Sequence, residues 1–71
     1  MNMRILKKGC TGEDVRALQL LLTGRGCSCG SADGSFGAKT ENAVKAYQKK
    51  TGLTQDGIAG EKTMGSLLGV G

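Results

Sequence analysis

The sequence predicts an all-α fold, a small three-helix bundle with two similar Asp-Gly-x-x-Gly turn-to-helix connections. Apolar residues recur at helical spacing in three separate segments, which is typical of amphipathic helices. Glycine-rich stretches separate these segments, and the chain contains 13 glycines and no proline. Because 71 residues leave room for one small core, we expect a single domain over 1–71 with its core at about 6–69.

The first periodic segment predicts a helix over 12–23. Its predicted buried face consists of Val15, Leu18, Gln19 and Leu22. Thr11 and Asp14 have the three-residue separation of a capping box, which favours a helix start at this point. Gly24 is the expected end of the helix, in the left-handed conformation that glycine tolerates.

Two further segments predict helices over 38–50 and 60–68. The buried stripe of the first is expected to hold Thr40, Ala43, Val44 and Tyr47. The second has Met64, Leu67 and Leu68 on its apolar face. Gly52 and Gly69 are the expected helix ends. No strand is predicted, although the bend at each Asp-Gly allows a short bridge.

The two connections repeat a sequence, "DGSFGAKT" at 33–40 and "DGIAGEKT" at 56–63. An Asp at a turn commonly accepts a hydrogen bond from its own backbone, and Gly supplies a positive φ. Each string also leads into a helix start, where free N–H groups and the helix dipole favour anions. Turn building and ligand binding are therefore both open as roles.

Composition narrows the function classes. Ten Lys and Arg against six Asp and Glu give a net charge of +4, which favours an anionic partner without identifying it. No apolar stretch approaches the roughly 20 residues of a membrane span. The start of the chain lacks an apolar signal-peptide core. If the domain works outside a cell, we therefore expect export by a parent protein or phage-type lysis.

The residues for catalysis or metal binding are missing. The chain has no histidine to act as a general base or to complete a zinc site. Its three cysteines, Cys10, Cys27 and Cys29, are odd in number and are expected to be buried or half-buried free thiols. We expect no metal, no cofactor and no catalysis by this chain alone.

The order of motifs resembles the peptidoglycan-binding domain of type 1 over about residues 6–69. The resemblance is carried by "LKKGCTGEDVRALQLLL", "DGSFGAKTENAVKAYQKKTGL" and "QDGIAGEKTMGSLLG". The residues that match the family's motifs are Gly9, Gly12, Val15, Leu18, Gln19, Leu22, Asp33, Gly34, Phe36, Gly37, Thr40, Ala43, Val44, Gln48, Gly52, Leu53, Asp56, Gly57, Gly60 and Thr63. Tyr47 replaces the family's usual Phe, and the cysteine-bearing loop at 24–32 is particular to this sequence.

The resemblance implies a non-catalytic module that anchors a cell-wall hydrolase to bacterial peptidoglycan. The implied partners are a stem peptide or glycan and a catalytic amidase, muramidase or peptidase domain in the parent chain. The implied location is the bacterial cell wall or the extracellular space, with no membrane partner.

Two alternatives belong to other classes. A related helical fold serves as a protease propeptide through a cysteine switch motif, but neither "KGCTG" nor "RGCSCG" resembles that motif; a protein-interaction module of the same fold stays open. A weak nucleic-acid binder is disfavoured because the third helix has only Lys62 as a basic residue and no Arg or Asn to read bases.

The candidate ligand-binding residues gather around the two repeated strings. They are Asp33, Ser35, Phe36, Gly37, Thr40, Asn42, Tyr47, Gln48, Asp56, Gly57 and Ile58. The rings of Phe36 and Tyr47 also suit the core, and Gln19 and Gln48 either tie down a loop or face a ligand. If one ligand lies between the two turns, the contrast of Ser35 with Ile58 gives the groove a direction.

Overall fold

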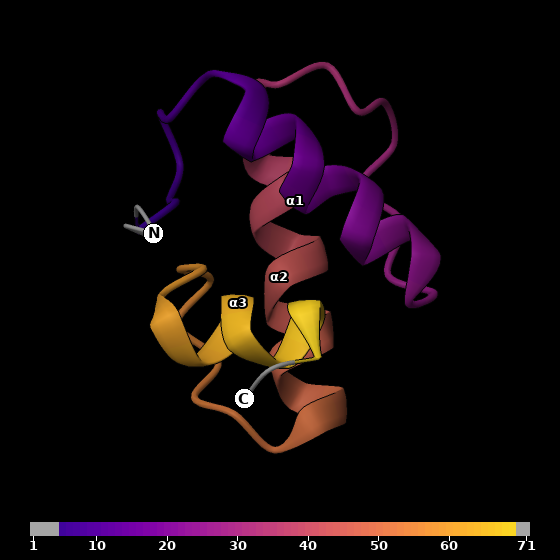
Figure 1. Cartoon of the computed structure of the whole chain (residues 1–71), viewed down its shortest axis with the longest axis vertical. Helices are drawn as coiled ribbons and strands as arrows, with labels where there is room; N and C mark the ends of the chain where they lie inside the picture. The colour runs from indigo at the N-terminus through magenta and orange to yellow at the C-terminus, as the bar shows by residue number, and fades with distance from the viewer. Residues whose placement is uncertain (1–4, 70–71) are drawn as a thin grey trace.

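The computed structural model describes residues 5–69, which form three α-helices. They are α1 (Glu13–Gly24), α2 (Ala38–Thr51) and α3 (Glu61–Leu68). α1 packs against both α2 and α3, and in Figure 1 it crosses in front of α2. Residues 5–69 contain isolated bridges but no strand. The three predicted helices are confirmed, to within one residue at every end.

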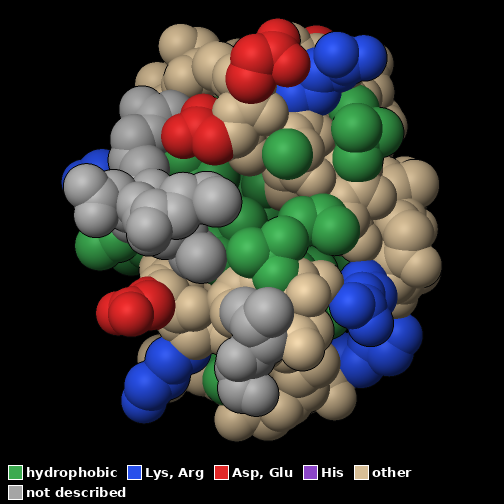
Figure 2. Space-filling model, viewed as in Figure 1, with side chains coloured by type: hydrophobic (Ala, Val, Ile, Leu, Met, Phe, Trp, Pro, Cys, Tyr) green, Lys and Arg blue, Asp and Glu red, His purple; other side chains and the backbone are tan. Residues whose placement is uncertain are grey.

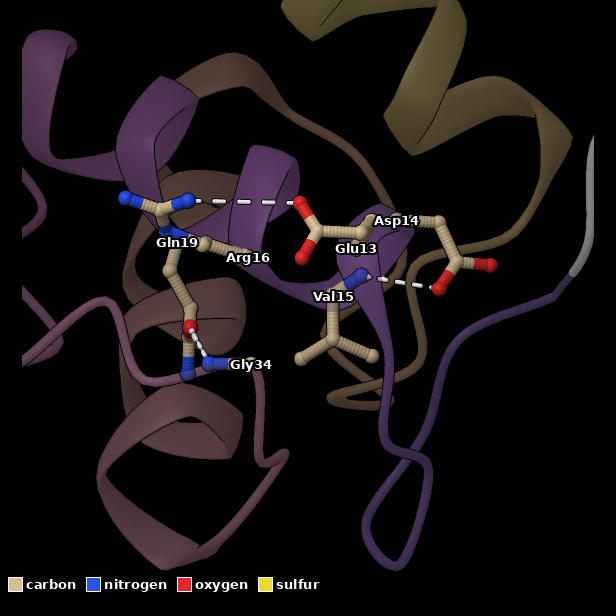
Figure 3. Close-up of polar contacts among 6 residues, drawn as sticks. All are labelled: Glu13, Asp14, Val15, Arg16, Gln19 and Gly34. Carbon is tan, nitrogen blue, oxygen red and sulfur yellow. Dashed lines mark hydrogen bonds and ion pairs between the residues drawn. The ribbon is translucent and has the colours of Figure 1, made fainter.

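Each helix begins after a glycine. The N-cap residues are Gly12, Gly37 and Gly60, and none of these caps has a side-chain hydrogen bond. The predicted capping box is therefore wrong, because Thr11 lies one residue before the N-cap of α1. Asp14 instead accepts a hydrogen bond from the N–H of Val15, at 3.0 Å (Figure 3). Without side-chain caps, the first turns of these helices depend on tertiary packing for their stability.

The helix ends agree with the prediction at two of three places. Gly52 and Gly69 cap α2 and α3 in the left-handed conformation, with φ of 76° and 77°. Gly24 is still helical, and the positive φ after α1 belongs to Gly26, at 82°. The cap bond from Cys27 N–H to the Leu22 carbonyl, at 2.9 Å, then turns the chain back towards the core.

The predicted buried faces form one core. It contains Leu6, Val15, Leu18, Leu22, Cys27, Cys29, Phe36, Ala43, Val44, Tyr47, Ala59, Met64 and Leu67. Leu68 is an error of the prediction: it is 48% exposed because it follows the inward-facing Leu67 by about 100° of helical turn. The interior therefore combines aliphatic side chains from all three helices with both aromatic rings of the chain.

The segment before α1 binds both turns. Leu6 and Ala59 exchange two backbone hydrogen bonds, of 3.1 and 2.8 Å. Further along, the Phe36 N–H donates to the Cys10 carbonyl, at 2.9 Å, and a second bridge pairs Thr11 with Ser35. The short bridges expected at the two bends are thus confirmed. This segment therefore holds both turns through backbone hydrogen bonds, and Figure 1 shows it as the indigo trace that leads into α1.

The three cysteines are free thiols, as expected. Cys27 and Cys29 are buried and Cys10 is half-buried. The thiol of Cys29 donates to the Gln19 carbonyl, at 3.7 Å. Within residues 5–69 no cluster of three or more His, Cys, Asp or Glu side chains is placed to hold a metal ion.

The surface is mixed in character. On the face shown in Figure 2, hydrophobic side chains gather at the centre and charged side chains surround them. Among residues 5–69, the exposed large hydrophobic residues are Ile5, Leu20, Ile58 and Leu68. In the described part of the chain, no helix is both long and apolar enough to cross a membrane.

Candidate functional site

Gln19 of α1 anchors the first turn with four hydrogen bonds. The two N–H groups of its Nε2 are shared among three acceptors, Asp33 Oδ1, the Ser35 carbonyl and Thr40 Oγ1, at 3.2, 3.0 and 3.0 Å. Its Oε1 accepts from the Gly34 N–H, at 2.8 Å, and Figure 3 shows this side chain extending from α1 to the turn. Gln19 is 1% exposed, so the whole amide is used inside the protein.

Gln48 of α2 anchors the second turn in the same way. The two N–H groups of its Nε2 are shared among Asp56 Oδ1, the Ile58 carbonyl and Thr63 Oγ1, at 2.9, 2.9 and 3.2 Å. Its Oε1 accepts from the Gly57 N–H, at 3.0 Å. Of the two roles that the sequence leaves open for these glutamines, the structure shows loop anchoring. We call each set of bonds an amide frame.

The local geometry of each turn explains its Asp-Gly pair. Asp33 Oδ1 accepts from the N–H of Ser35, at 2.9 Å, and Asp56 Oδ1 accepts from that of Ile58, at 3.0 Å. Gly34 has a φ of 78°, and a Cβ there would lie 3.1 Å from the Gly12 carbonyl oxygen. A side chain at this position would be strained by both its backbone and its neighbour.

Hydrogen bonds lower the pKa of both aspartates. The N–H of Ser35 and then the Gln19 amide lower the pKa of Asp33 below its ordinary value. The N–H of Ile58 and then the Gln48 amide lower the pKa of Asp56 in the same way. Hydrogen bonds to the charged form have this effect. Both residues are exposed, and the hydrogen bonds from the glutamine amides and from the Ser35 and Ile58 N–H groups all go to Oδ1.

A cavity lies beside each amide frame. The first pocket, of about 300 Å³, is lined by Gln19, Cys29, Ser31, Asp33, Ser35, Gly37, Ala38, Lys39 and Thr40. The second pocket, of about 340 Å³, is lined by Gln48, Leu53, Thr54, Asp56, Ile58, Gly60, Glu61, Lys62 and Thr63. Neither contains residues of both turns. Each turn therefore has its own pocket, and the two do not form the single groove considered from the sequence.

The predicted site residues divide among these places. Asp33, Ser35, Gly37 and Thr40 line the first pocket, whereas Gln48, Asp56 and Ile58 line the second. Asn42 is exposed on α2 and lines a separate cleft beside the 26–30 loop. Phe36, Tyr47 and Gly57 line neither pocket.

The positions of the two aromatic residues favour a structural role. Phe36 is 2% exposed and Tyr47 3% exposed, both within the core. The Tyr47 hydroxyl is 2.6 Å from Ser66 Oγ, so its polar end already has a protein partner. A ligand in either pocket would not contact these rings.

Sequence reasoning missed several residues that line the pockets. They are Cys29, Ser31, Ala38 and Lys39 in the first pocket, and Leu53, Thr54, Gly60, Glu61 and Lys62 in the second. The two lysines carried a usable signal, because Lys39 and Lys62 occupy the same position in the repeated strings. Ser31 and Thr54 carried none, since each lies in a connection without periodicity.

A protein-family model described as "Putative peptidoglycan binding domain" matches residues 11–67. The chain belongs to this family. Among curated proteins, the N-acetylmuramoyl-L-alanine amidase CwlL of Bacillus licheniformis is 48% identical over 69 residues, covering 94% of this chain and 19% of the amidase. The spore cortex-lytic enzyme of Bacillus cereus is 42% identical over 65 residues, covering 92% of this chain and 25% of that enzyme.

Solved structures agree with this assignment. The crystal structure of the SleB N-terminal domain matches with a TM-score of 0.92 and 39% identity, covering 97% of this chain and 94% of that one. The Burkholderia AP3 phage endolysin matches with a TM-score of 0.86 and 41% identity, covering 90% of this chain and 24% of the endolysin. As a family member, the chain is a non-catalytic peptidoglycan-binding module, and it spans about a fifth to a quarter of the curated relatives.

Proposed function

We propose that this module holds a cell-wall hydrolase on its substrate by binding a peptidoglycan stem peptide in the first pocket. The observation that carries the proposal is that Asp33 and Lys39 line the same pocket, beside the turn that the Gln19 amide frame anchors. The curated relatives support the proposal, because the two named above are an amidase and a spore cortex-lytic enzyme.

The groups in the first pocket suit a peptide. Stem peptides carry carboxylates, including free C-terminal ones, and amide groups. The ammonium of Lys39 attracts a carboxylate, and Asp33 Oδ2 accepts a hydrogen bond from a peptide N–H. The hydroxyls of Ser31 and Ser35 add donors and acceptors.

Rigidity favours binding at this place. The Gln19 amide has all four of its bonds within the protein, so the turn does not need to reorganise when a ligand arrives. A preformed site loses less conformational entropy on binding than a mobile loop does. Because the pocket is small and open, we expect its affinity for a single peptide to be weak. A catalytic domain linked to the module would still be held close to its substrate whenever the module is bound.

The location and the catalytic partner follow from the same proposal. The relatives act on cell-wall or spore-cortex material by name, and the chain spans a small share of each. We therefore place this module at the bacterial cell wall or outside the cell, attached to a hydrolase domain.

The first test is co-sedimentation with purified sacculi. Lys39→Glu should reduce retention strongly, because it removes the cation of the first pocket. Lys49→Glu is the matched control, since Lys49 is exposed on the same helix and lines neither pocket. Equal loss in both variants would show that retention follows net charge alone, and the proposed site would be wrong.

The second test separates peptide from glycan. Sacculi whose stem peptides have been removed enzymatically should retain the wild-type module poorly, and a soluble stem peptide should compete for intact sacculi. In an NMR titration, the same peptide should shift the amide signals of residues 31–40. Full retention on the stripped glycan would overturn the stem-peptide assignment.

A further inference from the structure

We propose that the second pocket is a second peptide subsite, so that one module binds two peptide groups of the same polymer. The inference rests on the proposed function and adds to it a site with its own lining. The sequence had suggested one ligand between the two turns. We propose instead two ligand groups, one beside each turn.

The second pocket repeats the groups that the first offers to a ligand. Its Asp56 is exposed and has Oδ1 bound by the frame, as Asp33 has. Its Lys62 occupies the position of Lys39 in the repeated string. The two cavities are also of similar size, at about 300 and 340 Å³.

The resemblance continues beyond the turns. The first pocket shares Lys39 and Cys29 with a neighbouring cleft of about 410 Å³ along α2. The second shares Lys62 and Leu53 with a neighbouring cleft of about 420 Å³ along α3. In each half, a lysine therefore lines two neighbouring depressions. Neither amide frame uses that lysine or that second cleft, so turn building alone does not account for them.

The two linings differ in a way that assigns different parts of a peptide to them. Where the first pocket has the hydroxyl of Ser35, the second has the side chain of Ile58, with Leu53 nearby. Glu61 stands in the second pocket at the position of Ala38 in the first. The second subsite thus suits a peptide segment with a small apolar side chain and a free amino group, and the first suits a segment with a carboxylate.

Two subsites on one small body change how the module holds a polymer. The longest extent of the molecule is 26 Å, so both pockets lie within reach of neighbouring groups on one wall fragment. Binding of the second group is then intramolecular, at an effective concentration on the order of millimolar. Polymer should consequently be retained much more strongly than a single soluble stem peptide.

The test blocks each pocket separately. Ser31→Trp fills the first pocket and Thr54→Trp fills the second, both at exposed positions. Gln55→Trp is the control, because Gln55 is the exposed neighbour of Thr54 and lines neither pocket. Retention on sacculi should fall about tenfold or more in each blocked variant and stay unchanged in the control.

An NMR titration with one soluble stem peptide that carries a free amine and a free carboxylate then assigns the sites. Thr54→Trp should lose the peptide-induced shifts at 53–63 and keep those at 31–40, and Ser31→Trp should do the reverse. The amide spectrum of each variant without ligand reports whether it is folded. If Thr54→Trp is unfolded, Lys62→Glu against Lys49→Glu gives the same comparison at surface positions; if Ser31→Trp is unfolded, Lys39→Glu against Lys49→Glu does so for the first pocket.

The outcomes separate this inference from the proposed function. If Thr54→Trp and Lys62→Glu retain sacculi as their controls do, while Ser31→Trp fails, the module has one subsite and the second is overturned. If Ser31→Trp also behaves as the control and the peptide shifts no signal at 31–40, the first pocket is not the site, and the proposed function fails.

Discussion

Gln48 and Thr63 are joined across α2 and α3 by a hydrogen bond of 3.2 Å between Nε2 and Oγ1, with both side chains buried. Thr40 occupies the same place relative to Gln19, at 3.0 Å. In each case a buried glutamine of one helix binds a threonine in the first turn of the next. The amide frames therefore fix how consecutive helices meet, and the pockets lie on the surface of these joints.

Replacing the glutamines should destabilise the fold more than any surface change. Gln48→Leu leaves the Gly57 N–H and Thr63 Oγ1 buried without partners. Each unsatisfied buried group costs about 1–3 kcal/mol. The free energy of unfolding should fall by at least that amount in a urea titration. Gln55→Leu, at an exposed position, is the control and should stay within about 0.5 kcal/mol of wild type. Equal stability of the two variants would contradict the role of the frame.

Two glycine substitutions should have opposite effects. Gly34→Ala combines a φ of 78° with a Cβ 3.1 Å from the Gly12 carbonyl oxygen, so it should lower stability by more than about 1 kcal/mol. Gly24→Ala lies in α1, has no atom within 4 Å of the new Cβ, and should raise stability by about 0.5–1 kcal/mol. Thermal unfolding followed by circular dichroism measures both. A loss of stability in Gly24→Ala would contradict the expectation.

Acid should weaken the two turns. The pKa values of Asp33 and Asp56 are lower in the folded state, so their contribution is complete above the unfolded-state pKa of about 3.9. It is lost as pH falls through the folded-state values. Urea unfolding measured from about pH 7 downwards should show this loss below about pH 4. A double variant, Asp33→Asn with Asp56→Asn, should be less stable at neutral pH and less sensitive to acid. The same acid slope in both proteins would exclude these carboxylates as the cause.

Removing the Tyr47 hydroxyl separates structure from binding. Tyr47→Phe deletes the 2.6 Å contact with Ser66 and should cost about 0.5–1.5 kcal/mol of stability. Retention on sacculi should be unchanged, because the ring lines neither pocket. Weaker retention by a well-folded Tyr47→Phe protein would restore this residue to the binding site.

The cysteines should differ in reactivity. Cys10 is half-buried, whereas Cys27 and Cys29 are 8% and 3% exposed. A thiol reagent such as Ellman's reagent should modify Cys10 first in the native protein, and the other two only on the timescale of local opening. All three should react rapidly in denaturant. Equal native rates would indicate that the 24–32 loop opens freely.

The helix positions were predictable because buried residues recur at helical spacing in the sequence. Val15, Leu18 and Leu22 show this spacing in α1, and the other two helices have similar buried faces. The same spacing placed Gln19 and Gln48 on buried faces but did not reveal their partners. Those partners come from turns 14 and 8 residues away, and such distances are set by loop geometry.

The pockets were less predictable for a related reason. Asp33 and Asp56 stand out in the repeated strings, and both line a pocket. Ser31 and Thr54 lie in irregular connections, where no period indicates which way a side chain points. Phe36 and Tyr47 are the only aromatic residues of the sequence and were predicted as binding residues. Both are instead buried in the core, where their large rings fill space between the helices.

The unequal lengths of the two connections bear on the order of folding. The Gln48–Asp56 contact closes a separation of 8 residues, and the Gln19–Asp33 contact closes one of 14. The entropic cost of closure rises with the logarithm of loop length, so the longer one costs on the order of 0.5 kcal/mol more. We therefore expect the second turn to close before the first.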